Sequence, residues 1–296
     1  MAITAAQVKE LREMTGAGMM DCKKALVECE GDFKKAVDWL REKGISKAAK
    51  KEGRTAADGL TRVVVDGNRA VVVEINSETD FVAKNEKFLN LLDMTVSAIM
   101  ANPAVKTVDE ALALKTADGT LNDAFINAVA IIGEKIKLRR FDVVEKNADE
   151  IFGSYMHNGG QISAVVVVKG TEDAQVAKDM AMQVASMSPS YVSRADMPQE
   201  IVAHERTIQE ELLRNDETMA NKPDRVKAGI VEGRLSKSLQ DMCLIDQIYF
   251  KNQDIKCGEY LKENHAEVVC FVKYKVGEGI EKKQEDFAAE VAAMAK

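Results

Sequence analysis

Residues 71–85 read VVVEINSETDFVAKN and hold the pattern that decides the fold. The run of valines at 71–73, with Ile75, predicts a buried strand, and Ser77 with Asp80 has the Ser-x-x-acid form of a capping box. Apolar side chains then recur at helical spacing, at Val82, Leu89, Leu92, Val96 and Ile99. The stretch therefore predicts a strand followed by a helix, with Asp80 in the first helical turn, where the helix dipole favours negative charge.

The same pattern occurs a second time in the chain. Residues 165–179 match residues 71–85 without a gap, and seven of the fifteen positions are identical: Val71, Val72, Val73, Glu78, Val82, Ala83 and Lys84. The second copy keeps a cap-type residue, Thr171, but has Ala174-Gln175 in place of Asp80-Phe81. The chain is therefore duplicated here, and it predicts two related α+β subdomains.

Phe81 has two interpretations. It falls at the edge of the apolar face of the expected helix, so periodicity alone allows a core residue as well as a projecting contact residue. The second copy lacks the Asp-Phe pair and so shows that the strand-helix unit does not need it. This favours contact with another molecule as the role of Asp80 and Phe81.

Three stretches carry a resemblance to a known family. Residues 77–85, SETDFVAKN, follow a valine-rich strand; residues 11–26 read LREMTGAGMMDCKKAL; and residues 276–282 read VGEGIEK. Together they resemble the signatures of elongation factor Ts, the bacterial guanine-nucleotide exchange factors, and nearly the whole chain is covered. The resemblance implies elongation factor Tu as the partner, and exchange activity without covalent chemistry, a catalytic residue, a metal or a cofactor of the factor's own.

The resemblance also implies three sets of contact residues. An exchange wedge would consist of Thr79, Asp80, Phe81 and Val82, acting on the magnesium and GDP that the partner holds. A second set would lie on the amino-terminal module, at Met19, Met20 and Lys23. A third would lie in the second subdomain, at His157, Asn158 and Gly159. Near the third set the chain has Gln161 and Ser163 where the family more often has a basic residue and a glycine.

Composition limits the class of protein. The chain has 296 residues, enough for two or more domains, and no run approaches the roughly 20 apolar residues that span a bilayer. No signal-peptide pattern is present, so we expect a cytoplasmic protein, and the resemblance implies a bacterial one. Its five cysteines form no Cys-x-x-Cys pair, and its three histidines lack metal-ligand spacing. A net charge of −7 disfavours a mainly electrostatic grip on nucleic acid and favours a protein partner.

The first part of the chain predicts a small helical module. Residues 1–54 form a three-helix, ubiquitin-associated-like bundle with a basic connecting segment, in which Val8, Leu11 and Met14 line the first helix and Gly44 ends the third. No Walker motif follows Gly16 and Gly18, so a phosphate cradle is disfavoured. Cys22 and Cys29 are expected to pack as small apolar residues.

The remaining boundaries follow from strand and helix patterns. Residues 55–145 form the first core subdomain, in which Asp66-Gly67-Asn68 turns a hairpin, and residues 146–198 with 239–277 form the second. Residues 199–238 predict an inserted antiparallel helical hairpin, which would serve a homodimer or a 2:2 complex, or be a passive insertion. Its apolar seams are expected at Ile201, Ile208, Leu212 and Met219, and at Val226, Ile230 and Leu235. Residues 278–296 predict a docking helix carrying Phe287, Val291 and Met294.

Two other functions remain as alternatives. An enzyme would need Glu78 and Asp80 to act as a carboxylate pair, but neither has a histidine or a metal ligand identified beside it. An RNA-associated or ribosome-binding adaptor would use the basic residues Lys47, Lys50, Lys51 and Arg54, but aromatic residues are only 5% of the chain and no stacking motif is present. Both are less favoured than a partner-binding protein.

Overall fold

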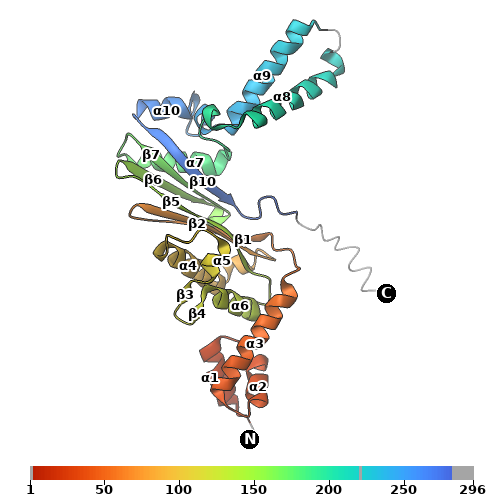
Figure 1. Cartoon of the computed structure of the whole chain (residues 1–296), viewed down its shortest axis with the longest axis vertical. Helices are drawn as coiled ribbons and strands as arrows, with labels where there is room; N and C mark the ends of the chain where they lie inside the picture. The colour runs from red at the N-terminus through yellow and green to blue at the C-terminus, as the bar shows by residue number, and fades with distance from the viewer. Residues whose placement is uncertain (1–2, 220–221, 282–296) are drawn as a thin grey trace. The chain divides into compact units, whose positions relative to one another are not determined.

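The computed structural model describes residues 3–219 and 222–281, which divide into two compact units. Of these residues, the first unit comprises 3–62, 71–143 and 274–281, and the second comprises 63–70, 144–219 and 222–273. Helices and small sheets are mixed along the chain (Figure 1), so the predicted α+β class is confirmed. The helix expected near Phe287, Val291 and Met294 lies outside the described residues.

The first unit begins with three helices: α1 (Ala5–Thr15), α2 (Met19–Glu28) and α3 (Phe33–Lys51). Their shared core consists of Val8, Leu11, Cys22, Ala25, Leu26 and Ala36. Gly16 ends α1 in the left-handed conformation that glycine adopts without strain. Cys22 packs in this core as predicted, and Cys29 packs against it. Met14 does not line it: its side chain is 64% exposed.

Helix α3 is longer than predicted. Gly44 does not end it but lies buried in its interior, where a Cβ atom would meet Ala130 and Ile126 of α6. The basic segment expected as a connection forms the last helical turns, because residues 45–51 include alanines and lysines, which are good helix formers, and no helix breaker. Helix α3 therefore belongs to the amino-terminal module at its start and packs against α6 further along.

A three-stranded sheet forms the centre of the first unit, in the order β1 (Asp58–Asp66), β2 (Arg69–Ser77), β5 (Lys137–Glu145). Helices α4 (Glu86–Ala101), α5 (Val108–Leu112) and α6 (Leu121–Ile132) gather on one side of it (Figure 1), with the short pair β3 (Lys115–Thr116) and β4 (Gly119–Thr120). Val71, Val73 and Ile75 alternate along β2 and pack against these helices. The strand predicted from the valine run is thus confirmed.

The second unit contains a three-stranded sheet in the order β10 (Glu267–Lys275), β7 (Ile162–Lys169), β6 (Glu150–His157), with β6 and β7 antiparallel. Helix α7 (Ala174–Met187) covers it. At Gly153 a Cβ atom would lie 1.9 Å from the carbonyl oxygen of Ala177, so only glycine allows β6 and α7 to approach this closely. The short strands β8 (Ile248–Tyr249) and β9 (Asn252–Lys256) and helix α10 (Cys257–Glu263) complete the unit.

The two sheets repeat one topology. In each, a hairpin supplies an outer and a central strand, β1-β2 and β6-β7, and a later strand, β5 or β10, pairs with the free edge of the central strand. The central strands β2 and β7 are the two copies identified in the sequence. The predicted duplication is therefore confirmed.

An antiparallel helical hairpin projects within the second unit (Figure 1), formed by α8 (Gln199–Arg214) and α9 (Asp224–Met242). Its seam differs from the predicted one. Leu213, not Leu212, is buried on α8, Met219 lies in a separate turn beyond that helix, and α9 buries Val231, Leu235 and Leu239. Leu212 and Val226 are 53% and 44% exposed. Leu235 is thus confirmed as a seam residue, whereas Leu212, Met219 and Val226 are not. Polar pairs, Arg206 with Glu232 and Ser238 with Glu205, complete the contact between the helices.

The buried Asp179 of α7 predicts an acid-sensitive second unit. Burial acts to raise the pKa of Asp179, but hydrogen bonds from Lys251, Tyr249 and Gln175 outweigh it and hold the pKa below its ordinary value. A carboxyl group whose pKa is lower in the folded chain stabilises it above the ordinary value of about 3.9, and that contribution disappears as pH falls through the folded pKa.

We therefore expect Asp179→Asn to make the stability of the second unit less dependent on pH between about pH 5 and pH 2. Near-UV circular dichroism of the tyrosines measures this, because Tyr155, Tyr191, Tyr249 and Tyr260 belong to this unit. Asp254→Asn, at an exposed position, is the matched control. An unchanged pH dependence in Asp179→Asn would contradict the assignment.

Candidate protein-binding site

The chain does not enter a helix directly after β2. Residues 78–81 form a turn, Val82–Lys84 form a single 3-10 turn, and α4 begins only at Glu86. The predicted capping box is wrong: the Ser77 hydroxyl donates to the carbonyl oxygen of Thr79 at 2.8 Å, and the cap of α4 is Asn85, which accepts from Lys87 N at 2.9 Å. Asp80 therefore lies in an exposed turn, not in a helix.

The second copy differs at this point. There α7 begins at Ala174, which corresponds to Asp80, and its cap is Asp173, which accepts from Gln175 N at 2.8 Å. Thr171, the expected cap, accepts instead from Asp173 N. The first copy thus holds residues 80–85 outside its α-helix, where the second copy has the start of α7. The Asp80-Phe81 pair lies in this structural difference.

Phe81 is not a core residue. Its side chain is 78% exposed, whereas the next residues, Val82 and Ala83, are 5% and 9% exposed and belong to the core of the first unit. Asp80 is also exposed. An exposed phenylalanine forgoes the free energy that burial of its ring would contribute. The two residues that follow it in the chain are packed in the core, so the ring projects from a fixed turn. The arrangement presents one aromatic ring and one carboxylate to solvent.

Hydrogen bonds hold the turn in place from the other side. Thr79 donates from its backbone nitrogen to Glu134 Oε2 at 2.9 Å and from its hydroxyl to Glu134 Oε1 at 2.7 Å. Glu78 accepts from the backbone nitrogen of Lys135 at 2.5 Å and pairs with Arg54 at 3.2 Å. The Glu78 carboxylate is thus engaged by Lys135 N and Arg54, whereas Asp80 is exposed.

The predicted residues of the amino-terminal module lie on an exposed face of α2. The side chains of Met19 and Met20 are 51% and 74% exposed, and Lys23 is exposed. Val27, one turn beyond Lys23, is 55% exposed and extends this face, although the sequence analysis did not identify it. Two methionines and a valine around a lysine form a small apolar surface of the kind that binds proteins.

The third predicted set lies in the second unit, where β6 ends. His157 is exposed, and its Nδ1 lies 3.3 Å from the hydroxyl oxygen of Tyr155. Asn158 and Gly159 follow in a 3-10 turn, both with positive φ.

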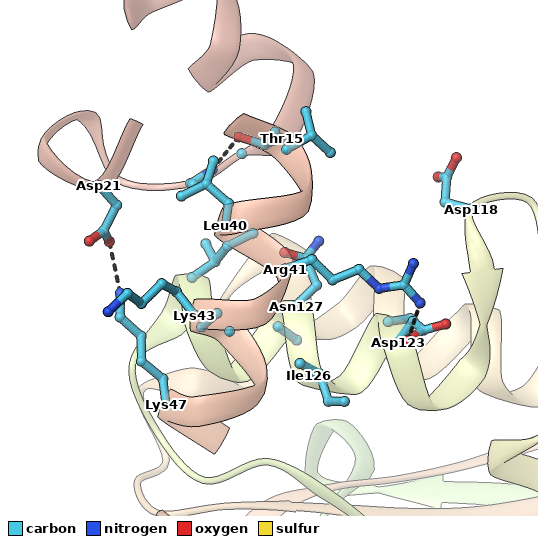
Figure 2. Close-up of a pocket in the computed structure, with 18 of the residues that line it drawn as sticks. Thr15, Asp21, Leu40, Arg41, Lys43, Lys47, Asp118, Asp123, Ile126 and Asn127 are labelled. Atoms are coloured by element: carbon cyan, nitrogen blue, oxygen red, sulfur yellow. Dashed lines mark hydrogen bonds and ion pairs between the residues drawn. The ribbon is translucent and has the colours of Figure 1, made fainter. Parts of the chain in front are cut away.

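A groove of about 820 Å³ lies in the first unit between α3 and the helices α4 and α6. Two ion pairs lie along it: Arg41 reaches Asp123 at 2.7 Å and Lys47 reaches Asp21 at 2.8 Å (Figure 2). Hydrogen bonds from the Thr120 backbone and from Arg41 lower the pKa of Asp123. None of the predicted contact residues lines this groove, so the predicted site is a set of projecting side chains and not a cavity.

Comparison with known proteins finds a family match that includes the Phe81 turn. Residues 78–278 match the family described as Elongation factor TS. The chain belongs to the elongation factor Ts family. It is 50% identical to Elongation factor Ts of Oenococcus oeni over 290 residues, which cover 98% of this chain and 97% of that protein. It is also 50% identical to Elongation factor Ts of Limosilactobacillus reuteri over 289 residues, with 98% and 97% covered.

As a member of the elongation factor Ts family, the chain is a translation elongation factor. Within residues 3–219 and 222–281, no helix is long and apolar enough to cross a membrane. The same residues contain no group of three or more histidine, cysteine or acidic side chains placed to hold a metal ion. Three of the four basic residues of the RNA alternative make contacts within the protein: Lys47 with Asp21, Lys51 with the Gly133 carbonyl and Arg54 with Glu78.

Sequence reasoning missed Glu134 as a residue of this candidate site. It is 55 positions from Thr79, so no local pattern connects the two. The nearest sequence feature is Gly133, which ends α6 with φ 87° and lets the chain turn toward Thr79.

Proposed function

We propose that this protein binds elongation factor Tu in its GDP form and promotes release of GDP, after which GTP rebinds. The observation that supports this most strongly is Phe81, an exposed ring on a turn held by hydrogen bonds on one side and by buried residues on the other. In this proposal the factor acts in the bacterial cytoplasm, has no covalent chemistry, and needs no metal or cofactor of its own.

The proposed mechanism is a difference in affinity. A factor that binds the nucleotide-free GTPase more tightly than the GDP form must weaken GDP binding by the same factor. Phe81 would enter an apolar gap near the partner's magnesium site with Asp80 beside it, and would displace groups that hold magnesium and the phosphates. Magnesium bridges phosphate oxygens and offsets their charge, so its displacement weakens GDP binding.

Phe81 cannot supply the whole effect. Each tenfold loss of GDP affinity requires about 1.4 kcal/mol of coupling, and a buried aromatic contributes roughly 1.5 to 3 kcal/mol. The remaining free energy would come from the exposed face of α2 around Met20 and Lys23, and from the His157 turn of the second unit.

Release of a fluorescent GDP analogue from elongation factor Tu tests the proposal. Stopped-flow mixing with excess unlabelled GDP should show release that accelerates with the concentration of this protein. If the protein leaves the release rate unchanged, the proposed function is wrong.

A second prediction concerns the amino-terminal module. Removing residues 1–54 would also remove α3, which packs against α6, so point variants are the sharper test. We expect Met19→Ser/Met20→Ser to raise the concentration of factor needed for half-maximal acceleration by about tenfold and to leave the maximal rate nearly unchanged. Met187→Ser is the matched control, because Met187 is 52% exposed but lies in the second unit. An unchanged half-maximal concentration would remove the anchoring role of α2.

A further inference from the structure

Two acidic side chains exchange hydrogen bonds between the Phe81 turn and the loop after α6. Glu134 of the loop accepts from the backbone nitrogen of Thr79, and Glu78 of the turn accepts from the backbone nitrogen of Lys135. Each segment thus contributes one carboxylate and one backbone donor. This reciprocal pairing fixes both the distance and the direction between the two segments.

Thr79 has all of its polar groups engaged. Its nitrogen and hydroxyl donate to the two carboxylate oxygens of Glu134, and its carbonyl accepts from Ser77. Among the residues that the structure describes, no cation lies within ion-pair distance of Glu134. The Glu134 carboxylate accepts both donors of Thr79, so its charge is directed at one residue of the turn.

The turn is also fixed at its far end. Val82 and Ala83 are buried, and the carbonyl oxygen of Phe81 accepts from Lys84 N at 3.2 Å. The backbone of Phe81 is therefore held on both sides while its ring is 78% exposed. A ring held in this way loses less conformational freedom on binding than a ring on a free loop.

The same junction reaches the end of α3. Lys51 donates to the carbonyl oxygen of Gly133, Lys135 reaches the carbonyl oxygen of Glu52, and Arg54 pairs with Glu78. The helix that continues from the amino-terminal module is thus tied to the two segments that hold Phe81.

We propose that Glu134 is a positioning residue for nucleotide exchange, acting through Thr79 to hold Phe81 ready to enter the partner. This inference rests on the proposed function, because the ring must act on elongation factor Tu for its position to matter. Glu134 does not touch the nucleotide. It lowers the ordering cost of the step in which Phe81 inserts.

Glu134→Gln tests the proposal with little change in size. The amide is uncharged and has one oxygen where the carboxylate has two, so in the same orientation only one of the two Thr79 donors meets an oxygen, and both bonds lose their charge assistance. We expect the maximal rate of GDP release to fall by about tenfold and the half-maximal concentration of factor to change by less than about twofold. Amide hydrogen exchange at Thr79 should become faster, while amides of β2 keep their protection.

A matched control is Glu110→Gln in the same unit, since Glu110 accepts from the backbone nitrogens of Lys106 and Thr107 but lies elsewhere in the sequence and makes no contact with Thr79. It should leave the exchange rate unchanged. Thr79→Val removes the hydroxyl donor alone and serves if Glu134→Gln folds poorly. In the Thr79→Val background, Glu134→Gln should have a smaller effect than in the native chain.

The outcomes separate the two proposals. If native protein accelerates release and Glu134→Gln does so equally well, the positioning role is wrong and the exchange function stands. The positioning role is also wrong if the double variant loses as much GDP-release activity as the Glu134→Gln and Thr79→Val losses combined, because Glu134 would then act independently of Thr79. If native protein does not accelerate GDP release, the proposed nucleotide-exchange function is wrong. The positioning role is then wrong as well, even if Glu134→Gln changes the rate of amide hydrogen exchange at Thr79.

Discussion

Phe81→Ala should remove most of the acceleration of GDP release while the folded chain keeps nearly its full stability. The ring is 78% exposed, so its removal leaves no cavity in the core of the first unit. In the complex the same ring would be buried in an apolar gap. The rate of GDP release and the stability of the chain therefore distinguish a partner-contact role of Phe81 from a core-packing role. The sequence pattern alone could not distinguish them.

The size of the effect follows from burial. A fully buried phenylalanine side chain contributes roughly 1.5 to 3 kcal/mol relative to an exposed one, which corresponds to about a tenfold to hundredfold change in rate if the contact forms in the transition state. Substitution at an exposed site usually changes stability by less than about 0.5 kcal/mol. We thus expect a large change in rate with a melting temperature shifted by no more than about 2 °C.

Stopped-flow release of the fluorescent GDP analogue measures the rate, and circular dichroism measures the melting temperature. Asp80→Ala/Phe81→Ala should show at least the same loss, and Met187→Ala serves as an exposed apolar control in the second unit. A large drop in melting temperature would mean that Phe81 supports the fold. Acceleration equal to that of the native protein would place the mechanism at other residues.

Local sequence patterns predicted the elements that depend on near neighbours. The valine run predicted β2, and comparison with residues 165–179 predicted the second strand, because a central strand buried along nearly its whole length reads as a short continuous apolar run. The same comparison identified Asp80-Phe81 as dispensable for the unit. The exposure of Phe81 agrees with that reasoning, although its contact with a partner stays a prediction.

The errors arose where a distant residue decided the outcome. Ser77 and Asp80 fit a capping box, but Glu134 accepts from Thr79 and keeps the chain out of a helix at that point. Gly44 fits a helix end, but α6 packs against it and α3 continues. On α8, polar pairs with α9 rotate the seam from Leu212 to Leu213. Contacts over tens of residues leave no local pattern in a single sequence.

Glu74 is a further residue that a single sequence could not explain, and it carries the largest expected effect on stability. It lies in the middle of the valine run, and the matching position of the second copy is Val168. Its side chain is fully buried and accepts from Arg139 at 2.9 Å, Arg140 at 2.6 Å and the backbone nitrogen of Gly277 at 2.8 Å. One buried carboxylate thus joins β2, β5 and the segment after β10.

Glu74→Val should destabilise the first unit by about 3 to 5 kcal/mol, because it leaves Arg139 and Arg140 without their buried partner. Valine fits the equivalent strand position of the second copy, so the loss would come from the two arginines that lose their buried partner and not from strand propensity. Urea denaturation followed by fluorescence of Trp39, the one tryptophan, reports on this unit. Asp93→Asn is the control, because it breaks a pair with Arg62 in which Asp93 is 61% exposed, and we expect it to cost less than about 1 kcal/mol.

A compensated variant separates charge from shape. Replacing both arginines with leucine in the Glu74→Val background removes the charges that lose their partner when Glu74 is replaced. Exchanging a whole buried ionic cluster for apolar residues is often close to neutral. We expect the triple variant to regain much of the lost stability. If Glu74→Val proves as mild as Asp93→Asn, or if the triple variant is less stable than Glu74→Val, then the buried carboxylate does not hold these segments together.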